Sequence, residues 1–424
     1  MVAAIAPLGI ALLSLILRLI NLGRPKGFVF DEVYYVDGAR DFLKYGVEVS
    51  GSKPEFIVHP PVGKWLIASG IKLFGDNEFG WRFATAIIGT LLILLFARLV
   101  HVLFYSPLLT GIGAFLMACD GLMLVHSRTA LLDLFLTFFV LLAIYLWHQQ
   151  RHWFAAIAIG LAMGCKWSAI YFLVAMVFVS LYKIFSRHPS KDLVRSIIMK
   201  FIQYGFLPII VYIGSWTGWF LSNRGWDRQW STNPFTSWIH YHSEMLGFHT
   251  GLTEKHSYQA NPWSWMVMGR PTSFFYESPK GCGSDNCAQE VLAIGTPLLW
   301  WAGTIAVAVT VGFWLRSLVR RTSEPALNLI VLGMAAGYLP WFFFQSRTVF
   351  TFYAIVFEPF MILALVDCAK LLLDSSLKSG ISQALVAAFV TVIFLNFIYF
   401  LPIFTGEIIT YDAWLQRMWM SSWI

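Results

Sequence analysis

The feature that most constrains the fold of this chain is a series of long apolar stretches. A helix needs about 20 consecutive apolar residues to cross a bilayer. The stretches that approach or reach this length lie at 2–20, 83–104, 107–126, 131–148, 153–165, 168–185, 201–220, 291–315, 326–344, 349–369 and 382–403. Only 12% of the residues are charged, whereas about 25% are charged in a typical soluble protein. The sequence therefore predicts an all-α polytopic membrane protein with about eleven transmembrane helices.

Basic residues between these stretches predict the orientation of the chain. The loops after the even-numbered stretches carry Lys and Arg with few acids, and such loops are cytoplasmic by the positive-inside rule. The basic residues in these loops or near the ends of the preceding stretches are Arg98, Arg151, Lys183, Arg187, Lys191, Arg195, Lys200, Arg316, Arg320, Arg321, Lys370 and Lys378. We therefore expect a multi-pass plasma-membrane protein with a cytoplasmic N-terminus and two extracytoplasmic loops, 21–82 and 221–290. Because no repeat or flexible linker interrupts it, residues 1–424 are predicted to form a single membrane domain.

The first outer loop is predicted to contain two amphipathic helices beside the membrane. Residues 34–45 and 62–74 mix apolar and charged side chains at helical spacing. Between them, Pro60 and Pro61 cannot continue a helix and therefore separate the two segments. The apolar face of the second helix is suited to the membrane surface, with its lysines turned to water or headgroups.

Two adjacent carboxylates, Asp31 and Glu32, follow the first apolar stretch. Ionisable groups at a membrane boundary are functional candidates. Neither ATP nor nucleotide sugar is present outside the membrane, so a catalytic carboxylate there suits a lipid-carried phosphate ester as donor. Transfer from such a donor needs a base for the acceptor's proton and cations that stabilise the departing phosphate. The basic residues on the outer side or buried near it are His59, Lys64, Arg82, Arg128, Lys166, Arg270 and Arg347.

Structural explanations compete with function for several of these residues. Arg128 and Asp133 lie across a short turn between two spans, and an ion pair that fixes this turn is as reasonable as catalysis. Lys166 lies in another short turn, where it could only snorkel to the headgroups. For Arg82 we favour function, although an arginine at the end of a span often contacts lipid phosphate, because a specific anionic substrate needs similar donors.

Metal and nucleic-acid partners are not predicted. His240, His242, His249 and His256 suggest a metal cluster, but their spacing is irregular and ordinary hydrogen bonding is the simpler explanation. A divalent ion that assists a phosphate donor is a further alternative, although Arg and Lys supply the same charge. The basic residues are not massed in one patch, as nucleic-acid binding would require.

Two cysteines share a short polar loop. Cys282 and Cys287 would form a small disulfide if that loop is extracytoplasmic. A structural metal is the alternative for this pair, but two cysteines without nearby partners cannot complete a tetrahedral site.

Several motifs resemble those of the protein O-mannosyltransferases. The most specific combination is Phe-Asp-Glu-Val-Tyr-Tyr at 30–35 with His-Pro-Pro-Val-Gly-Lys at 59–64. Further matches lie at 74–82, 127–133, 164–167, 248–252, 261–265, 268–276 and 347–353. The resemblance covers nearly the whole chain. The family belongs to the class C glycosyltransferases, which are multi-span enzymes with the catalytic acid in the first outer loop.

The resemblance implies a reaction and a role for each matched residue. The family transfers mannose, with inversion, from a polyprenyl- or dolichyl-phosphate carrier to Ser or Thr of secreted proteins. Asp31 would be the base, and Glu32 would position the acceptor or hold Asp31 in its working rotamer. Arg82 would bind the donor phosphate, with support from His59, Lys64, Lys166 and Arg347. The residues Arg128, Asp133, His249 and Arg270 would be structural or would lie on the acceptor side.

One departure from the family pattern narrows the resemblance. Eukaryotic members insert a β-trefoil domain between the seventh and eighth spans, whereas this loop has only about 70 residues, fewer than a common domain. The chain is therefore similar to bacterial, actinobacterial members with a polyprenyl carrier, whose acceptors would be modified beside the Sec secretion channel.

Two other functions stay open. The first is a class C enzyme that moves another sugar onto a lipid or wall glycan, against which the segments 248–252 and 269–273 argue. The second is a transporter or lipid flippase. Transporters usually show paired halves, and the two halves of this sequence do not resemble each other.

Overall fold

The computed structural model describes residues 2–186 and 193–424, and these form two compact units. Unit 1 contains residues 1–30, 85–129 and 255–424, and unit 2 contains residues 31–84 and 130–254. The predicted cytoplasmic residues Arg187 and Lys191 lie outside the described residues. The prediction of a single membrane domain stays a prediction.

Unit 1 consists mainly of apolar helices. They are α1 (Val2–Leu19), α4 (Glu78–Phe104, from Thr85 onward), α5 (Pro107–Ala118), α6 (Gly121–His126), α14 (Pro297–Arg320), α15 (Pro325–Tyr338), α16 (Glu358–Leu373) and α17 (Ser379–Thr405). Short 3-10 helices η2 (Pro262–Val267), η3 (Leu339–Phe344), η4 (Thr351–Val356) and η5 (Ser421–Trp423) join or flank them. Proline stands in the first turn of α5, α14, α15 and α16, where its missing N–H has no helical partner to lose.

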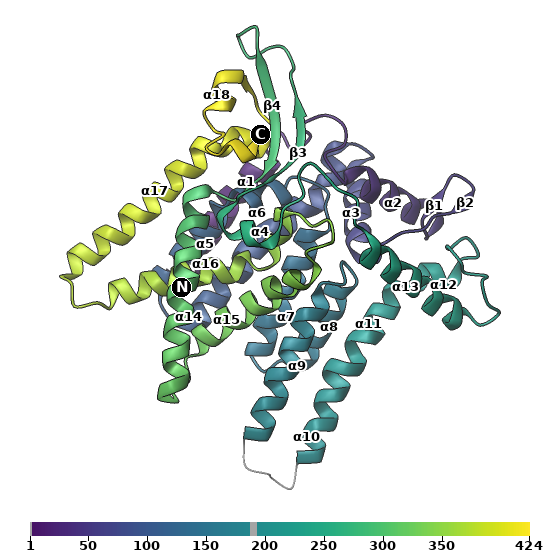
Figure 1. The fold of residues 1–424 in the computed structure, drawn as a ribbon, viewed down its shortest axis with the longest axis horizontal. Helices are drawn as coiled ribbons and strands as arrows, with labels where there is room; N and C mark the ends of the chain where they lie inside the picture. The colour runs from purple at the N-terminus through teal and green to yellow at the C-terminus, as the bar shows by residue number, and fades with distance from the viewer. Residues whose placement is uncertain (1, 187–192) are drawn as a thin grey trace. The chain divides into compact units, whose positions relative to one another are not determined.

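A three-stranded antiparallel sheet also belongs to unit 1. Its strands are β3 (Thr272–Glu277), β4 (Cys287–Ala293) and β5 (Ile408–Thr410), in the order β3-β4-β5. The hairpin of β3 and β4 is prominent in Figure 1, and α18 (Tyr411–Leu415) packs against β4 and β5. Cys282 and Cys287 form a disulfide at the hairpin's end.

The predicted span at 291–315 is wrong at its start. Residues 291–293 end strand β4, and the helix begins only at Pro297. Every residue of β4 is buried, and a strand buried on both faces has the same continuous apolar run as the beginning of a helix.

Unit 2 contains the first outer loop and a second group of helices. They are α2 (Glu32–Tyr45), α3 (Val62–Phe74), α7 (Asp133–His148), α8 (His152–Met163), α9 (Ala169–Ser186), α10 (Leu193–Lys200), the π-helix η1 (Phe201–Phe206), α11 (Leu207–Ser215), α12 (Thr217–Leu221) and α13 (Pro234–Gly251). A short antiparallel hairpin lies between α2 and α3, and its strands β1 (Val49–Ser50) and β2 (Lys53–Pro54) have two residues each. Helix α8 packs against α7 and α11 (Figure 1).

The two helices predicted in the first outer loop are confirmed. Helix α2 begins two residues before the predicted start and ends at Tyr45, and α3 has the predicted bounds. Each buries one face, and the two helices pack against each other. This packing against α3 holds α2, and therefore its first residues, in position.

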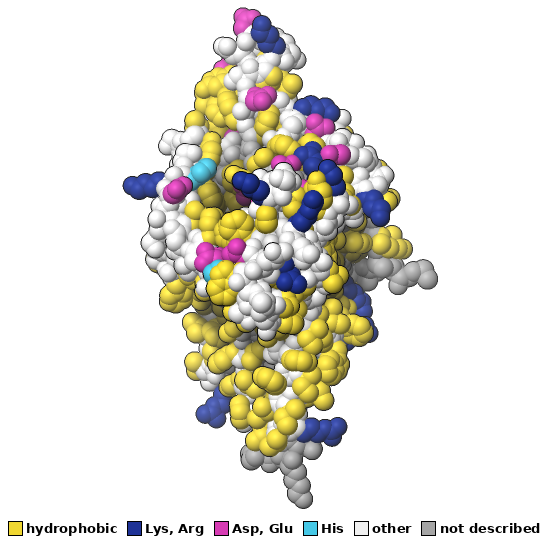
Figure 2. Space-filling view, turned by 90° about the vertical axis from the view of Figure 1, so that its right-hand side faces the viewer, with side chains coloured by type: hydrophobic (Ala, Val, Ile, Leu, Met, Phe, Trp, Pro, Cys, Tyr) yellow, Lys and Arg dark blue, Asp and Glu magenta, His cyan; other side chains and the backbone are white. Residues whose placement is uncertain are grey.

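The membrane character is confirmed, whereas the number of eleven spans is not. Within the described residues, six helices are long and apolar enough to cross a membrane, and four apolar helices are shorter. Their outward side chains remain apolar, as at Phe178, which is 70% exposed, and Ile305, which is 67% exposed. Figure 2 shows hydrophobic side chains over a broad part of the face in view. Lipid is the environment that suits such a surface.

Candidate active site

Asp31 occupies the N-cap position of α2. Its backbone carbonyl accepts the first helical bonds from Tyr34 and Tyr35, and its carboxylate Oδ2 lies 3.5 Å from the Tyr35 hydroxyl. Burial raises the pKa of Asp31 to about 6. The charge of Asp133 also raises this pKa, whereas Lys166 and the Tyr35 hydroxyl lower it. A carboxyl with this pKa is ionised at neutral pH and remains basic enough to accept a proton.

Glu32, the next residue, is fully buried and forms a two-point salt bridge with Arg82. Arg82 Nε donates to Oε1 and Nη2 donates to Oε2, both at 2.8 Å, and neither side chain is exposed. Oε1 also accepts the backbone N–H of Ala130 at 2.8 Å. This geometry fixes the first residue of α2 relative to α4 and the chain before α7. Since Arg82 donates two bonds to Glu32, its contribution to phosphate binding stays a prediction.

Lys166 and Asp133 form a second buried ion pair. Lys166 Nζ lies 3.0 Å from Oδ1 and 2.8 Å from Oδ2 of Asp133, and both side chains are nearly buried. Asp133 is the first residue of α7, and Lys166 lies in the turn between α8 and α9. Both charges act on Asp31. The structure therefore brings three sequence-predicted site residues together in unit 2.

An arc of aromatic rings leads away from Asp31. The ring centroids of Tyr35 and His59 are 6.0 Å apart, those of His59 and His249 5.4 Å, and those of His249 and Trp167 5.6 Å. His249 Nε2 lies 2.7 Å from the carbonyl of Val58. Tyr35 and Trp167 lie in matched motifs, but the sequence analysis gave neither a role. The position of Tyr35, four residues after Asp31 on a helix, was the signal that could have identified it.

The expectation that Lys64 faces water or headgroups is wrong, because Lys64 lies on the buried face of α3 and pairs with Glu48. Both side chains are almost completely buried, and burial raises the pKa of Glu48 to about 7. The sequence offered no motif for Glu48. A lysine on the buried face of an amphipathic helix nevertheless requires a counter-ion. This contact ties α3 to the loop after α2, and any donor contact of Lys64 stays a prediction.

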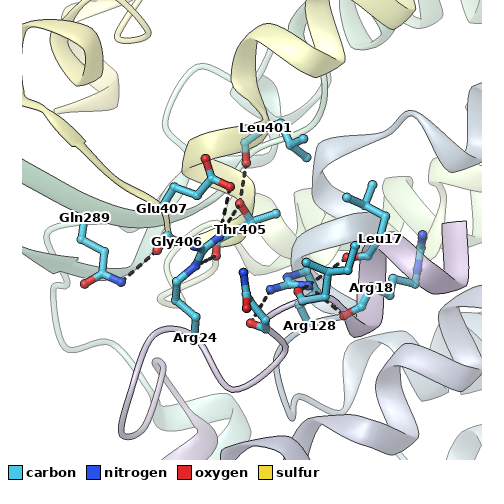
Figure 3. A network of polar contacts seen from close by, with 11 residues as sticks. Leu17, Arg18, Arg24, Arg128, Gln289, Leu401, Thr405, Gly406 and Glu407 are labelled. Carbon is cyan, nitrogen blue, oxygen red and sulfur yellow. Dashed lines mark hydrogen bonds and ion pairs between the residues drawn. The ribbon is translucent and has the colours of Figure 1, made fainter. Parts of the chain in front are cut away.

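Arg128 belongs to unit 1 and holds the end of α1. Its Nη1 donates to the carbonyls of Leu17, Arg18 and Ile20 at 2.8–3.1 Å, and its Nη2 donates to that of Asn21 at 2.9 Å (Figure 3). The last carbonyls of a helix have no helical partner, so a cation there satisfies them. An ion pair was expected between Arg128 and Asp133. Instead, Arg128 donates to these carbonyls, and Asp133 pairs with Lys166.

The two other predicted arginines also lie in unit 1. Arg270 Nη1 donates to the carbonyls of Ser422 and Ile424 at 2.5 and 2.6 Å, and its guanidinium lies 5.0 Å from the Tyr258 ring centroid. These are structural contacts. Arg347 is half-buried between η3 and η4, and its role stays a prediction.

Arg24 is a unit 1 residue that the sequence reasoning missed. It donates to the carbonyl of Thr405 at 3.3 Å and forms a salt bridge with Glu407 at 3.1 Å (Figure 3). No local signal marks a partner so distant in sequence.

The four histidines of the second outer loop have separate partners. His240 lies 3.4 Å from Asp227, His242 lies 2.8 Å from the Tyr212 hydroxyl, and His256 Nδ1 accepts the N–H of Tyr258. Within the part of the chain that the structure describes, no group of three or more His, Cys, Asp or Glu side chains is placed to hold a metal ion.

Solved structures define the fold class. The chain is similar to the Saccharomyces cerevisiae protein O-mannosyltransferase Pmt1-Pmt2 complex bound to the sugar donor, with a TM-score of 0.85, 15% identity and coverage of 100% of this chain and 93% of the other. It is also similar to ArnT from Cupriavidus metallidurans, with a TM-score of 0.55, 14% identity and coverage of 93% and 71%. The fold is that of the class C membrane glycosyltransferases.

Sequence relatives define the family. Residues 58–216 match the family model of dolichyl-phosphate-mannose-protein mannosyltransferase, and residues 234–423 match the C-terminal four-transmembrane region of protein O-mannosyltransferase. The polyprenol-phosphate-mannose–protein mannosyltransferase of Mycobacterium tuberculosis is 31% identical, with 98% of this chain and 90% of the relative covered. That of Corynebacterium glutamicum is 30% identical, with 93% and 88% covered. The chain belongs to the protein O-mannosyltransferase family and is a glycosyltransferase, as predicted.

Proposed function

We propose that this enzyme transfers mannose, with inversion, from polyprenyl-phosphate-mannose to Ser or Thr hydroxyls of secreted polypeptides. The observation that carries the proposal is Asp31, a half-buried carboxyl with a pKa of about 6 beside a buried Lys166–Asp133 pair. The names of the bacterial relatives supply the donor and the class of acceptor. The basic loops support a cytoplasmic N-terminus and an extracytoplasmic Asp31, and we propose that acceptors reach it as they leave the Sec channel.

In the proposed reaction, the Asp31 carboxylate accepts the proton of the acceptor hydroxyl. The hydroxyl oxygen then forms a bond to C1 of mannose from the face opposite the phosphate. The bond between C1 and the phosphate oxygen breaks with its electron pair, and polyprenyl phosphate leaves as an anion. One displacement at C1 inverts its configuration, and the proton remains on Asp31 until it is released to water.

The neighbouring ion pairs suit supporting roles in this step. Glu32, held by Arg82 and by the Ala130 N–H, positions the start of α2 and therefore Asp31. Lys166 is the cation whose charge acts on Asp31, so it is the first candidate to stabilise the departing phosphate. We also keep Arg82, Arg347, His59 and Lys64 as proposed donor-side residues; Arg82 and Lys64, like Lys166, have carboxylate partners.

The function is tested with membranes that contain this enzyme, radiolabelled polyprenyl-phosphate-mannose and a Ser/Thr-rich peptide. We expect label in the peptide, equal rates with and without EDTA, and none in control membranes that lack the enzyme. Label in lipid or wall glycan instead would assign the enzyme to another acceptor class. Donor movement without any product would indicate a transporter, and loss in EDTA with recovery in Mg²⁺ would indicate a metal-dependent reaction.

The acid limb of the pH profile is the first prediction for this mechanism. Because the raised pKa leaves Asp31 protonated below about pH 6, a base at this position predicts that kcat/KM rises through about pH 6 to a plateau. Lys166→Met removes a charge that lowers the pKa of Asp31, so the midpoint should move up. Asp133→Asn removes a charge that raises this pKa, so the midpoint should move down.

The control for the two shifts is Lys72→Met, an exposed lysine in the last turn of α3. The midpoint of the acid limb of kcat/KM for Lys72→Met should equal that for the wild type. Shifts of the same sign for Lys166→Met and Asp133→Asn would show that Asp31 does not set the acid limb.

A further inference from the structure

Three hydrogen bonds in unit 2 connect the turn that carries Lys166 to helix α13. Trp167, the residue after Lys166, donates its indole N–H to the Tyr212 hydroxyl oxygen at 2.8 Å. The Tyr212 hydroxyl lies 2.8 Å from Nε2 of His242, and Nδ1 of His242 lies 2.7 Å from the carbonyl oxygen of Trp238. Tyr212 belongs to α11, whereas His242 and Trp238 belong to α13, which lies at the end of α11 that leads into α12 (Figure 1). The chain of bonds therefore joins the turn between α8 and α9 to two other helices.

The direction of each bond follows from the groups that form it. A carbonyl oxygen only accepts, so the proton of His242 is on Nδ1 and Nε2 is an acceptor. Burial lowers the pKa of His242 to about 4, so the ring is neutral at physiological pH. The Tyr212 hydroxyl then donates its single proton to Nε2 and accepts from Trp167 with its oxygen. Removal of this hydroxyl would leave both of its partners unpaired, which is costly.

The ring of Trp167 is held as well as its N–H. It is stacked on the ring of His242, with centroids 5.8 Å apart and an interplanar angle of 26°, and its centroid lies 5.6 Å from that of His249. Both histidines come from α13. Trp167 also packs against the buried core cluster that contains Tyr212. These contacts fix the position of Trp167, and therefore the backbone of Lys166 directly before it.

Lys166 is the residue for which a fixed backbone matters most. Its ammonium group pairs with both carboxylate oxygens of Asp133, at 3.0 and 2.8 Å, and its charge acts on Asp31. A lysine carries a point charge at the end of a flexible stem. The place of that charge therefore depends on where the backbone of the turn is held.

We propose that Tyr212 and His242 are positioning residues of the transferase. Through Trp167 they hold the ammonium group of Lys166 in place relative to Asp31. Helix α13 belongs to the second outer loop, so this loop contributes to the site through the turn after α8. The inference rests on the proposed function, in which Asp31 is the base and Lys166 stabilises the departing phosphate.

The test is the pH profile of mannosyl transfer by Tyr212→Phe, which keeps the ring and removes the hydroxyl. We expect the acid limb of kcat/KM to move up in pH, as in Lys166→Met, because a loosened turn weakens the effect of Lys166 on Asp31. We expect kcat to fall about tenfold, since a misplaced catalytic group can cost up to about 10²-fold, with little change in KM for the peptide. The midpoint does not depend on the amount of folded enzyme, so it remains measurable in a less stable variant.

Two substitutions of His242 test the role of its acceptor nitrogen. His242→Leu removes the acceptor and should shift the acid limb as Tyr212→Phe does. His242→Gln places an amide oxygen near the position of Nε2, where it can accept the Tyr212 proton, and should restore the wild-type midpoint. Equal midpoints for His242→Leu and the wild type would overturn the proposal.

Tyr204→Phe is the matched control. Tyr204 is also buried, lies roughly two turns before Tyr212 in the same helical run, and its hydroxyl lies 2.7 Å from Nδ1 of His152. This variant loses a comparable bond, but its midpoint should equal that of the wild type. An equal shift in Tyr204→Phe would show general loosening of unit 2 and overturn the proposal.

Failure of this inference differs from failure of the proposed function. A shifted midpoint in Lys166→Met, with a wild-type midpoint and kcat in Tyr212→Phe, would overturn the positioning role alone and leave the chain of bonds a purely structural element. A wild-type enzyme that transfers no mannose to peptide would overturn the proposed function, and this inference with it.

Discussion

Asp31→Asn should reduce mannosyl transfer to a Ser/Thr peptide by at least about 10²-fold, because general-base catalysis contributes at least that factor. Asparagine keeps the shape of the side chain and a hydrogen-bonding oxygen for Tyr35, but it cannot accept the acceptor's proton. Donor binding should persist, since the buried pairs Glu32–Arg82 and Lys166–Asp133 are unchanged. The measurement is transfer by membranes supplied with polyprenyl-phosphate-mannose, together with donor binding to the purified variant.

A matched control separates the loss of the base from a change of charge. Asp37 also lies on α2 but is exposed, so Asp37→Asn should transfer at a rate near that of the wild type. Near-normal transfer by Asp31→Asn would place the base elsewhere, with Glu32 the first candidate. A variant that loses donor binding as well would show that Asp31 is required for the site to form.

Arg82→Met should be the most destabilising single substitution in unit 2. Breaking a buried ion pair costs about 3–5 kcal/mol, because the remaining charge stays in a nonpolar environment. Here the remaining charge is Glu32, whose side chain has no exposed surface. We expect a large fall in thermal stability in detergent and less folded protein in membranes.

The double variant Glu32→Leu/Arg82→Met distinguishes stability from function. Without either charge it should regain much of the lost stability, while transfer stays low because the start of α2 is no longer fixed. Arg40→Gln is the surface control. Its bridges to Asp37 and Asp76 are solvent-exposed, and such pairs are worth about 0–1 kcal/mol. Arg82→Met with wild-type stability would contradict the buried pair.

The candidate residues of the site were identified from the sequence, but their contacts were not. Asp31, Glu32, Arg82, Asp133 and Lys166 were all candidates, and the structure places all five in unit 2. The pairing of Glu32 with Arg82 and of Asp133 with Lys166 was not predictable. These partners are 50 and 33 residues apart, and no periodicity links such positions.

At Arg128 and β4, the sequence suggested a contact or an element that the structure does not have. A nearby acid in sequence suggested an ion pair for Arg128, but its guanidinium donates to the carbonyls at the end of α1. The apolar run of β4 suggested a membrane helix, but pairing with β3 and β5 makes it a buried strand. In both cases the deciding neighbour is remote in sequence.

By itself, the sequence determined the membrane class, the two amphipathic helices of the first outer loop and the carboxylate that begins α2. These depend on composition and on the spacing of apolar residues, which are properties of neighbouring positions. Only the tertiary structure decided which charges pair and how far burial raises the pKa of Asp31. Burial and electrostatic interaction depend on distance in space, and that distance is set when segments far apart in the chain pack together.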